Sequence, residues 1–234
     1  TIDANVEWHD AETLTVEGLG FADRKSPYDR LPARAEKVVR PTLWNQSHDT
    51  AGVVVRFATD ATAIHARWEL VHTRTSFPIM TAVAASGLDL YARSASGQWR
   101  WLGIGRPNRA PLNIEPVASS ITPGWREYLL YLPLRNGIVK LEIGVPKGSR
   151  VERGAPRPQG QRPIAFYGTS ITQGGCAYQI TSSSRMGEGY QLMVANGQIN
   201  LWGEPLSFVE LESEHSAATT CESPPATASA RSSQ

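Results

Sequence analysis

Apolar and polar residues alternate with a period of two along much of this chain, and that alternation most constrains its fold. In residues 64–70 the apolar side chains point one way, while His65, Arg67 and Glu69 point the other way. Residues 139–145 alternate in the same manner. Because successive side chains of a β-strand point to opposite faces, such runs predict strands with one buried face and one wet face.

Other runs rich in Val, Ile, Trp and Tyr extend this prediction. They cover residues 53–57, 80–85, 88–93, 99–104 and 127–132. Asn136-Gly137 lies between two of the candidate strands and is typical of a tight hairpin, and residues 94–97 are typical of a longer hairpin turn. Many short strands without a long helical pattern predict a mainly β fold, namely a β-sandwich of jelly-roll type.

The alternating pattern stops at a polar stretch rich in Gly and Pro. This stretch covers residues 147–162, and its composition is typical of a linker or an exposed crossing between domains. The sequence therefore predicts a β-sandwich domain over residues 1–146, a linker over 147–162 and a second part over 163–234. Residues 216–234 are mostly Ser, Ala, Thr and Pro, so we expect disorder from about residue 205.

Charge and composition argue against several classes of partner. The 234 residues include 23 Lys and Arg against 22 Asp and Glu, a formal net charge of +1. A chain this balanced has no field that would steer it to nucleic acid or to an anionic membrane. No apolar run approaches the roughly 20 residues of a membrane-spanning helix. The first residues do not read as a signal peptide, which favours a cytoplasmic location.

Metal and cofactor chemistry find no support in the sequence. The two cysteines, Cys176 and Cys221, have neither the number of a disulfide framework nor the spacing of a metal site. The five histidines show no i, i+4 pairing and no clustering with cysteine, which predicts solvated or structurally bonded roles. We therefore expect no metal and no cofactor.

The pattern changes at Pro163. Residues 164–167, Ile-Ala-Phe-Tyr, form a short continuous apolar run, as in a strand buried on both faces of a parallel sheet. Ser170 follows directly, where a helix can begin, and a helix N-terminus with its free N–H groups favours developing negative charge. This position suits a nucleophile. Because Thr172 replaces the second Gly of the G-x-S-x-G elbow, an ordinary α/β-hydrolase is disfavoured.

The same serine has a purely structural interpretation. Ser170 and Gln173 have the S-x-x-Q spacing of a capping box, in which the serine hydroxyl accepts from the backbone at the start of a helix. From the local pattern alone, both interpretations stay open.

Residues 163–177 resemble the first sequence block of SGNH, or GDSL-like, hydrolases, in the branch that reads YGTSITQGG. Four upstream motifs resemble the N-terminal sandwich domain of the same proteins: YDRLP at 28–32, GLDLY at 87–91, YLPL at 131–134 and LEIG at 141–144. The resemblance covers roughly residues 20–177. It implies an esterase or acyl hydrolase with Ser170 as nucleophile and its own N–H in the oxyanion hole, acting on a small-molecule or carbohydrate ester.

The resemblance ends at Tyr178. The family continues with a helix and the rest of a flavodoxin-like sheet, which supply a Gly and an Asn to the oxyanion hole and an Asp-x-x-His for the base. Residues 178–234 contain none of these blocks. We therefore expect an incomplete SGNH part, truncated or frameshifted after residue 177, with weak activity or none.

Two local features imitate the missing parts. Glu212 and His215 have an E-x-x-H spacing, but a base needs a scaffold that holds it within hydrogen-bond reach of the serine, so we interpret them as a surface pair. Asn196-Gly197 predicts a hairpin turn between residues 190–195 and 198–202 rather than a pair of oxyanion donors.

Four tryptophans are open to two interpretations. They could form an aromatic platform for sugars, but large aromatic side chains more often fill a sandwich core, and we interpret them as core residues. Alternation places Trp99 and Trp101 on one face of their strand. They are Trp68, Trp99, Trp101 and Trp125.

Two functions of different classes follow from these observations. One is an ester hydrolase by descent, with Ser170 as nucleophile and acetylated carbohydrate among its candidate substrates. The other is a non-catalytic β-sandwich module that binds carbohydrate or a protein partner.

Overall fold

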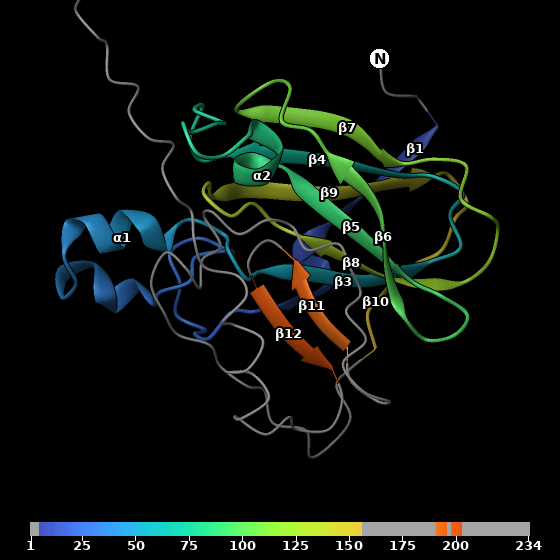
Figure 1. The fold of residues 1–234 in the computed structure, drawn as a ribbon, viewed down its shortest axis with the longest axis horizontal. Helices are drawn as coiled ribbons and strands as arrows, with labels where there is room; N and C mark the ends of the chain where they lie inside the picture. Colours follow the sequence, from blue (N-terminus) through green and yellow to red (C-terminus); the bar gives the residue numbers. More distant parts are fainter. Residues whose placement is uncertain (1–4, 156–190, 196–197, 203–234) are drawn as a thin grey trace, which may run out of the picture. The chain divides into compact units, whose positions relative to one another are not determined.

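Two antiparallel β-sheets make up most of the structure. The computed structural model describes residues 5–155, 191–195 and 198–202. One sheet has four strands in the order β1-β9-β4-β7, and the other has six strands in the order β10-β3-β8-β5-β6 with β2 beside β3 (Figure 1). The predicted mainly β sandwich is therefore confirmed.

The strands of the first sheet are β1 (Val6–Asp10), β9 (Ile138–Pro146), β4 (Ile64–Leu70) and β7 (Leu112–Ala118). The strands of the second sheet are β10 (Val151–Arg153), β2 (Thr15–Glu17), β3 (Val54–Thr59), β8 (Arg126–Tyr131), β5 (Leu88–Arg93) and β6 (Trp99–Gly105). Short helices connect them: η1 (Ala11–Thr13), η2 (Ala33–Lys37), α1 (Pro41–Ser47) and α2 (Ala82–Ser86). A separate hairpin consists of β11 (Gln191–Ala195) and β12 (Gln198–Trp202).

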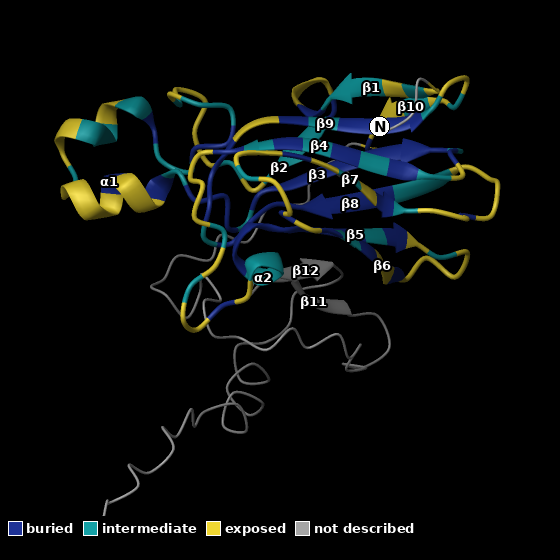
Figure 2. Cartoon of the chain, turned by 90° about the horizontal axis from the view of Figure 1, so that it is seen from above, coloured by how far each residue is buried: buried dark blue, intermediate teal, exposed yellow. Residues whose placement is uncertain are grey.

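The core lies between the two sheets and follows from the alternation. On β4 the apolar residues are buried and the polar residues between them are half-buried, as predicted. Trp68 of β4 is the largest fully buried side chain, and Phe57 of β3 stacks on Tyr128 of β8 at 5.3 Å between ring centroids. Figure 2 shows the strands mostly buried, with the exposed residues gathered in the connections and on α1.

Two of the predicted elements are wrong. Residues 80–85 were expected to be a strand, but they lead into α2, because Thr81 accepts a hydrogen bond from the Ala84 N–H and alanine favours helix. Asn136-Gly137 is not a hairpin turn, since β8 and β9 belong to different sheets. The hairpin at residues 94–97 is confirmed, because β5 pairs with β6 and Gly97 has a φ of +81°.

Gly137 serves close packing rather than a tight turn. A Cβ at Gly137 would lie 2.5 Å from the His48 carbonyl oxygen and 2.7 Å from Cγ2 of Val71. The Val71 N–H also donates to the Gly137 carbonyl at 2.9 Å. An Asn-Gly pair therefore carries the chain from one sheet to the other here, where a side chain would collide with backbone.

Sheet pairing reaches into the range expected to be a linker. Strand β10 pairs with β3 in antiparallel register, with Val151 opposite Thr59 and Arg153 opposite Phe57. The chain thus adds an edge strand to the six-stranded sheet before residue 155. Among the residues that the structure describes, no helix is long and apolar enough to cross a membrane.

An ion pair joins the two central strands of the four-stranded sheet. Arg67 of β4 lies opposite Glu142 of β9 and donates from Nη2 to Oε1 at 2.7 Å. The guanidinium also lies over the Trp8 ring at 4.5 Å, an arrangement that adds a cation–π contact. The hydrogen bond from Arg67 is the largest influence on Glu142 and holds the pKa of this carboxyl below its usual value.

We expect this ion pair to make stability depend on acidity. A lowered pKa in the folded state stabilises the fold above the carboxyl's unfolded pKa, and this contribution disappears as the pH falls through the folded value. Glu142→Gln should therefore lower the free energy of unfolding most at neutral pH, with the difference from the wild type shrinking in acid. Urea unfolding across this range measures it, with exposed Glu152→Gln as the control. A difference that is constant with pH would contradict the expectation.

Gly137→Ala should destabilise the fold, because the new Cβ meets the His48 carbonyl, which is backbone and yields poorly. Overpacking of this kind costs about 1–3 kcal/mol. Gly20→Ala is the matched control, since no atom lies within 4 Å of a Cβ at that position. Equal midpoints of chemical unfolding for the two variants would show that the backbone between β8 and β9 shifts to accommodate the new Cβ.

Candidate functional site

The predicted nucleophile, Ser170, lies outside the described residues, and so do Glu212 and His215. The predicted strands on either side of Asn196-Gly197 are confirmed, because Ala195 of β11 pairs with Gln198 of β12, whereas residues 196–197 themselves lie outside the described residues. Every functional side chain that can be described therefore belongs to the sandwich.

The motif Gly87-Leu88-Asp89-Leu90-Tyr91 begins where α2 ends. The Gly87 N–H donates to the Val83 carbonyl at 2.9 Å and so terminates the helix. A Cβ at Gly87 would lie 2.5 Å from that carbonyl oxygen and 2.8 Å from the Gly105 carbonyl oxygen on β6. Only glycine fits between helix and strand at this point.

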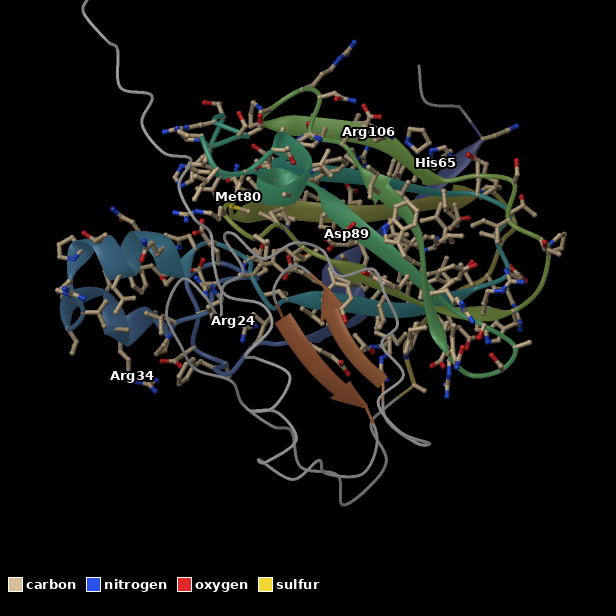
Figure 3. The ribbon with its side chains drawn as sticks, in the orientation of Figure 1. Arg24, Arg34, His65, Met80, Asp89 and Arg106 are labelled. Carbon is tan, nitrogen blue, oxygen red and sulfur yellow. The ribbon has the colours of Figure 1, made fainter. Side chains whose placement is uncertain are left out.

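The remaining residues of the motif lie on β5, and their side chains point alternately to the two faces of the sheet. Leu88 and Leu90 point into the core and are fully buried. Asp89 and Tyr91 point to the opposite face of the six-stranded sheet, where the Trp101 indole N–H donates to Asp89 Oδ1 at 3.4 Å. Asp89 is labelled in Figure 3 and is only 3% exposed. Burial first, and then the charge of Asp89, raises the pKa of Tyr91 to about 12.

This opposite face carries a second apolar cluster. Its buried members come from β3, β6 and β8, and Tyr91 of β5 packs against them. Tyr91 meets Tyr131 edge to face, with ring centroids 5.6 Å apart. We call this cluster, together with the neighbouring Trp101, the outer apolar face. Its members are Val54, Tyr91, Trp99, Trp101, Leu129 and Tyr131.

The interpretation of the tryptophans as core residues is correct for Trp68 alone. Trp99 is buried, but in the outer apolar face. Trp101 is 48% exposed, and Trp125 is exposed beside Arg150, whose guanidinium lies 4.4 Å from the ring centroid. Trp99 and Trp101 do share one face, as predicted. Alternation identified that face but gave no means of choosing between the two sides of the sheet.

The residues of the YDRLP segment make buried contacts and hydrogen bonds that fix this segment to the connection at residues 46–49. Tyr28 is buried in the core, and burial raises the pKa of its hydroxyl well above the usual value. The carboxylate of buried Asp29 lies 2.8 Å from Nδ1 of His48 and also accepts from the Ser26 N–H at 3.1 Å. Arg30 donates to the Asp49 and Gln46 carbonyl oxygens at 2.7 and 2.6 Å. His48 is thus structurally bonded, as the sequence predicted.

Asn136 ties three connections together. Its Oδ1 accepts from the His72 N–H, and its Nδ2 donates to the His72 and Arg74 carbonyls and lies 3.2 Å from Ser86 Oγ. Its own carbonyl accepts from the N–H and the hydroxyl of Thr50. The side chain is fully buried, so its amide holds the loop after β4 and the end of α2 in fixed positions, while the main-chain carbonyl holds Thr50 in the segment before β3.

A surface groove of about 610 Å³ lies beside this junction, between α1 and the loop after β4. Two arginines converge on one ring there, since the guanidiniums of Arg74 and Arg135 lie 4.7 and 5.1 Å from the Phe77 centroid. The Arg135 Nε atom is buried and has no hydrogen-bond partner. Within the described ranges, no three His, Cys, Asp or Glu side chains gather as a metal site.

The family assignment rests on a match over most of the sandwich. The model of the family described as "GxDLY: N-terminus of Esterase_SGNH_hydro-type" matches residues 6–151. The chain belongs to this family. Its GxDLY letters are Gly87, Asp89, Leu90 and Tyr91, whose packing roles are given above. The predicted relationship to SGNH, or GDSL-like, hydrolases is therefore confirmed.

One solved structure agrees with the GxDLY assignment. A Bacteroides ovatus ATCC 8483 protein described as a GDSL-like lipase is 28% identical, with a TM-score of 0.64 over 73% of this chain and 49% of its own length. The salicylyl-acyltransferase SsfX3 from a tetracycline biosynthetic pathway is 18% identical, with a TM-score of 0.45 over 66% of this chain and 43% of its own. No curated protein matches the chain. The chain thus spans about half the length of the lipase.

Asn136→Ala should unfold the GxDLY domain more easily than any exposed asparagine variant. Removing the amide leaves the His72 N–H and two loop carbonyls unpaired, at about 1–3 kcal/mol for each group that stays buried. Asn136→Asp should also destabilise, since a carboxylate oxygen would then face those carbonyls. Asn108→Ala, on the surface, is the control. Thermal unfolding of the three variants tests this prediction. Equal midpoints would show that the Asn136 side chain does not stabilise these loops.

Proposed function

We propose that this chain is an SGNH-type ester hydrolase by descent, in which Ser170 is the nucleophile. The proposal rests on the order of two features along the chain, a family match followed by a nucleophile-like sequence block. The GxDLY family, described as the N-terminus of SGNH-type esterases, covers residues 6–151, and the nucleophile-like block at 163–177 follows closely behind it.

The reaction proposed is acyl transfer to water in two steps. The Ser170 hydroxyl oxygen attacks the ester carbonyl carbon and passes its proton to a histidine base, and the leaving alcohol takes that proton when the acyl-enzyme forms. Water then attacks the acyl-enzyme and releases the carboxylic acid. The backbone N–H of Ser170 donates to the oxyanion in both steps. The substrate class proposed is a small-molecule ester or an acetylated carbohydrate.

We propose further that these 234 residues turn over esters poorly. A serine hydroxyl is a weak nucleophile without a base, and residues 178–234 hold no Asp-x-x-His block. Loss of a triad member leaves about 10³- to 10⁴-fold acceleration over water, which comes from the oxyanion hole and from binding. The Gly and Asn oxyanion donors of the family also have no counterpart after residue 177, so the remainder should be smaller still.

The test is hydrolysis of p-nitrophenyl acetate by the purified chain, beside Ser170→Ala. We expect slow turnover, only modestly reduced in the variant, with any acetylated residue mapped by peptide mass spectrometry to Ser170. Robust turnover that Ser170→Ala abolishes would contradict the predicted weakness, and His215→Ala would then identify the base. An acetyl group on other serines and none on Ser170 would contradict the assignment of the nucleophile.

A binding module is the second candidate, favoured by the exposed Trp101 and Trp125 and by the groove beside Phe77. In this case the sandwich would bind carbohydrate or a protein partner without catalysis. Quenching of tryptophan fluorescence by oligosaccharides, unchanged in Ser170→Ala and lost in Trp101→Ala, would support it.

A further inference from the structure

The groove beside Phe77 is positively charged, although the chain as a whole is nearly neutral. Helix α1, which forms one side of it, contains no charged residue. The loop at residues 71–80 contributes Arg74, and the connection at residues 133–137 contributes Arg135. Each of these two arginines is the one Lys, Arg, Asp or Glu of its segment. The charge of the groove is therefore set by two guanidinium groups.

One carboxyl group, that of Asp49, also lines the groove, but it is only 8% exposed and acts on another arginine. Arg30 donates from Nε to the Asp49 carbonyl at 2.7 Å, which brings the two side chains together. Burial lowers the pKa of Arg30, and the charge of Asp49 raises it in part. The charge of Asp49 is therefore offset by Arg30.

The two guanidinium groups of the groove are oriented but not neutralised. Both lie over the Phe77 ring, an arrangement that holds a cation in place without supplying an anion. Arg74 donates from Nε to the Ser76 carbonyl at 3.1 Å, and this acceptor is also uncharged. The Arg135 Nε atom is buried without a hydrogen-bond partner. Among the residues that the structure describes, neither arginine forms an ion pair, so the groove attracts an anion.

Backbone hydrogen bonds fix the residues that hold these charges. Phe77 and Met80 exchange two bonds, from each N–H to the other carbonyl, both at 3.0 Å. Met80, labelled in Figure 3, is buried at the end of this loop. The Arg135 N–H donates to the Ala85 carbonyl at 3.0 Å, and the next residue is the buried Asn136 described above. The cationic groove is therefore largely formed before a ligand arrives, which lowers the cost of binding.

The rest of the groove offers neutral hydrogen-bonding groups. Four uncharged hydroxyl and amide side chains line it, and none of them hydrogen-bonds to another residue in the described part of the chain. Such groups both donate and accept, as the hydroxyl groups of a sugar require. A guanidinium is the side chain best matched to a carboxylate, which it binds through two parallel N–H donors. The four neutral residues are Thr42, Asn45, Gln46 and Thr73.

We infer that the groove beside Phe77 binds an acidic carbohydrate, with its carboxylate on Arg74 and Arg135 and its hydroxyl groups on the neutral side chains. The volume of about 610 Å³ lies within the usual range of small-molecule sites, about 300–1,000 Å³. The inference rests on the second proposed function, a binding module, for which it names the ligand class and the site. It does not depend on the chemistry of Ser170.

The first experiment is calorimetric titration of the full chain with two probes, trigalacturonate and a hyaluronan tetrasaccharide. We expect at least one of them to bind, and the affinity to fall as salt is added, because the attraction is between charges. Fully methyl-esterified trigalacturonate keeps the hydroxyl groups but loses the charge, and it should not bind measurably. No binding of either acidic probe would overturn the inference. Inorganic phosphate that binds as tightly as the saccharides would also overturn it, because the ligand would then be a simple anion.

The second experiment locates the site with charge-removing variants. Arg74→Gln and Arg135→Gln should each weaken binding by about tenfold or more, since each removes hydrogen bonds to a charged group. Arg106→Gln is the matched control, because Arg106 is exposed on the connection between β6 and β7, outside the groove, and is labelled in Figure 3. Thermal unfolding verifies that the variants are folded. If Arg135→Gln is unfolded, Arg74→Gln in the exposed part of the loop decides the question alone. Wild-type affinity in the folded arginine variants of the groove would overturn the inference.

The results also separate this site from the proposed functions. Binding that is lost in Trp101→Ala but kept in Arg74→Gln and Arg135→Gln would overturn the groove and leave a binding module standing. Binding that is lost in the two arginine variants, with no acetylation of Ser170, would support the groove and remove the nucleophile.

Discussion

Burial of strands β3 and β8 of the six-stranded sheet on both of their faces is the constraint on which the rest of the structure depends. Strand β8 shows it most directly, because Tyr128, Leu129, Leu130 and Tyr131 are consecutive and all are buried. Two of these side chains enter the core of the sandwich and two enter the outer apolar face. A strand that is apolar on both sides belongs in the middle of three layers, whereas the two sheets supply only two. The outer apolar face therefore gives this sheet a second packed side beside the core.

The family's sequence motifs are explained by packing rather than by chemistry. Gly87 is required where α2 meets β6, and Asp89 and Tyr91 place a polar and an aromatic group on the outer apolar face. The Asp29 carboxylate is held by His48, so this Asp–His pair is a clamp between two connections. Asn136 does the same for the loops at that end of the sandwich. These residues fix the connections of the sandwich as a rigid frame.

Much of this frame could be predicted from the sequence, and the failures have physical causes. Regular alternation predicted β4 and β9, because burial of one face leaves a period of two, and runs rich in Val, Ile, Trp and Tyr predicted β3, β5, β6 and β8. The hairpin prediction for Asn136-Gly137 was wrong because an Asn-Gly pair usually marks a turn with positive φ. Here the glycine is needed because the backbone passes close to the His48 carbonyl. Residues 112–118 were missed because β7 contains Pro116 and is exposed at alternate positions. The site at Ser170 lies outside the described residues, so that prediction stays a prediction.

The unbroken apolar run of β8 was available in the sequence, and it carries more functional information than the alternation does. A half-buried strand specifies a surface, but a strand apolar on both sides specifies a neighbour. On β8, Leu129 and Tyr131 are buried on the outer side of the sheet, where they pack with Val54 and Trp99. Trp101, at the rim of this face, donates to Asp89 and is 48% exposed.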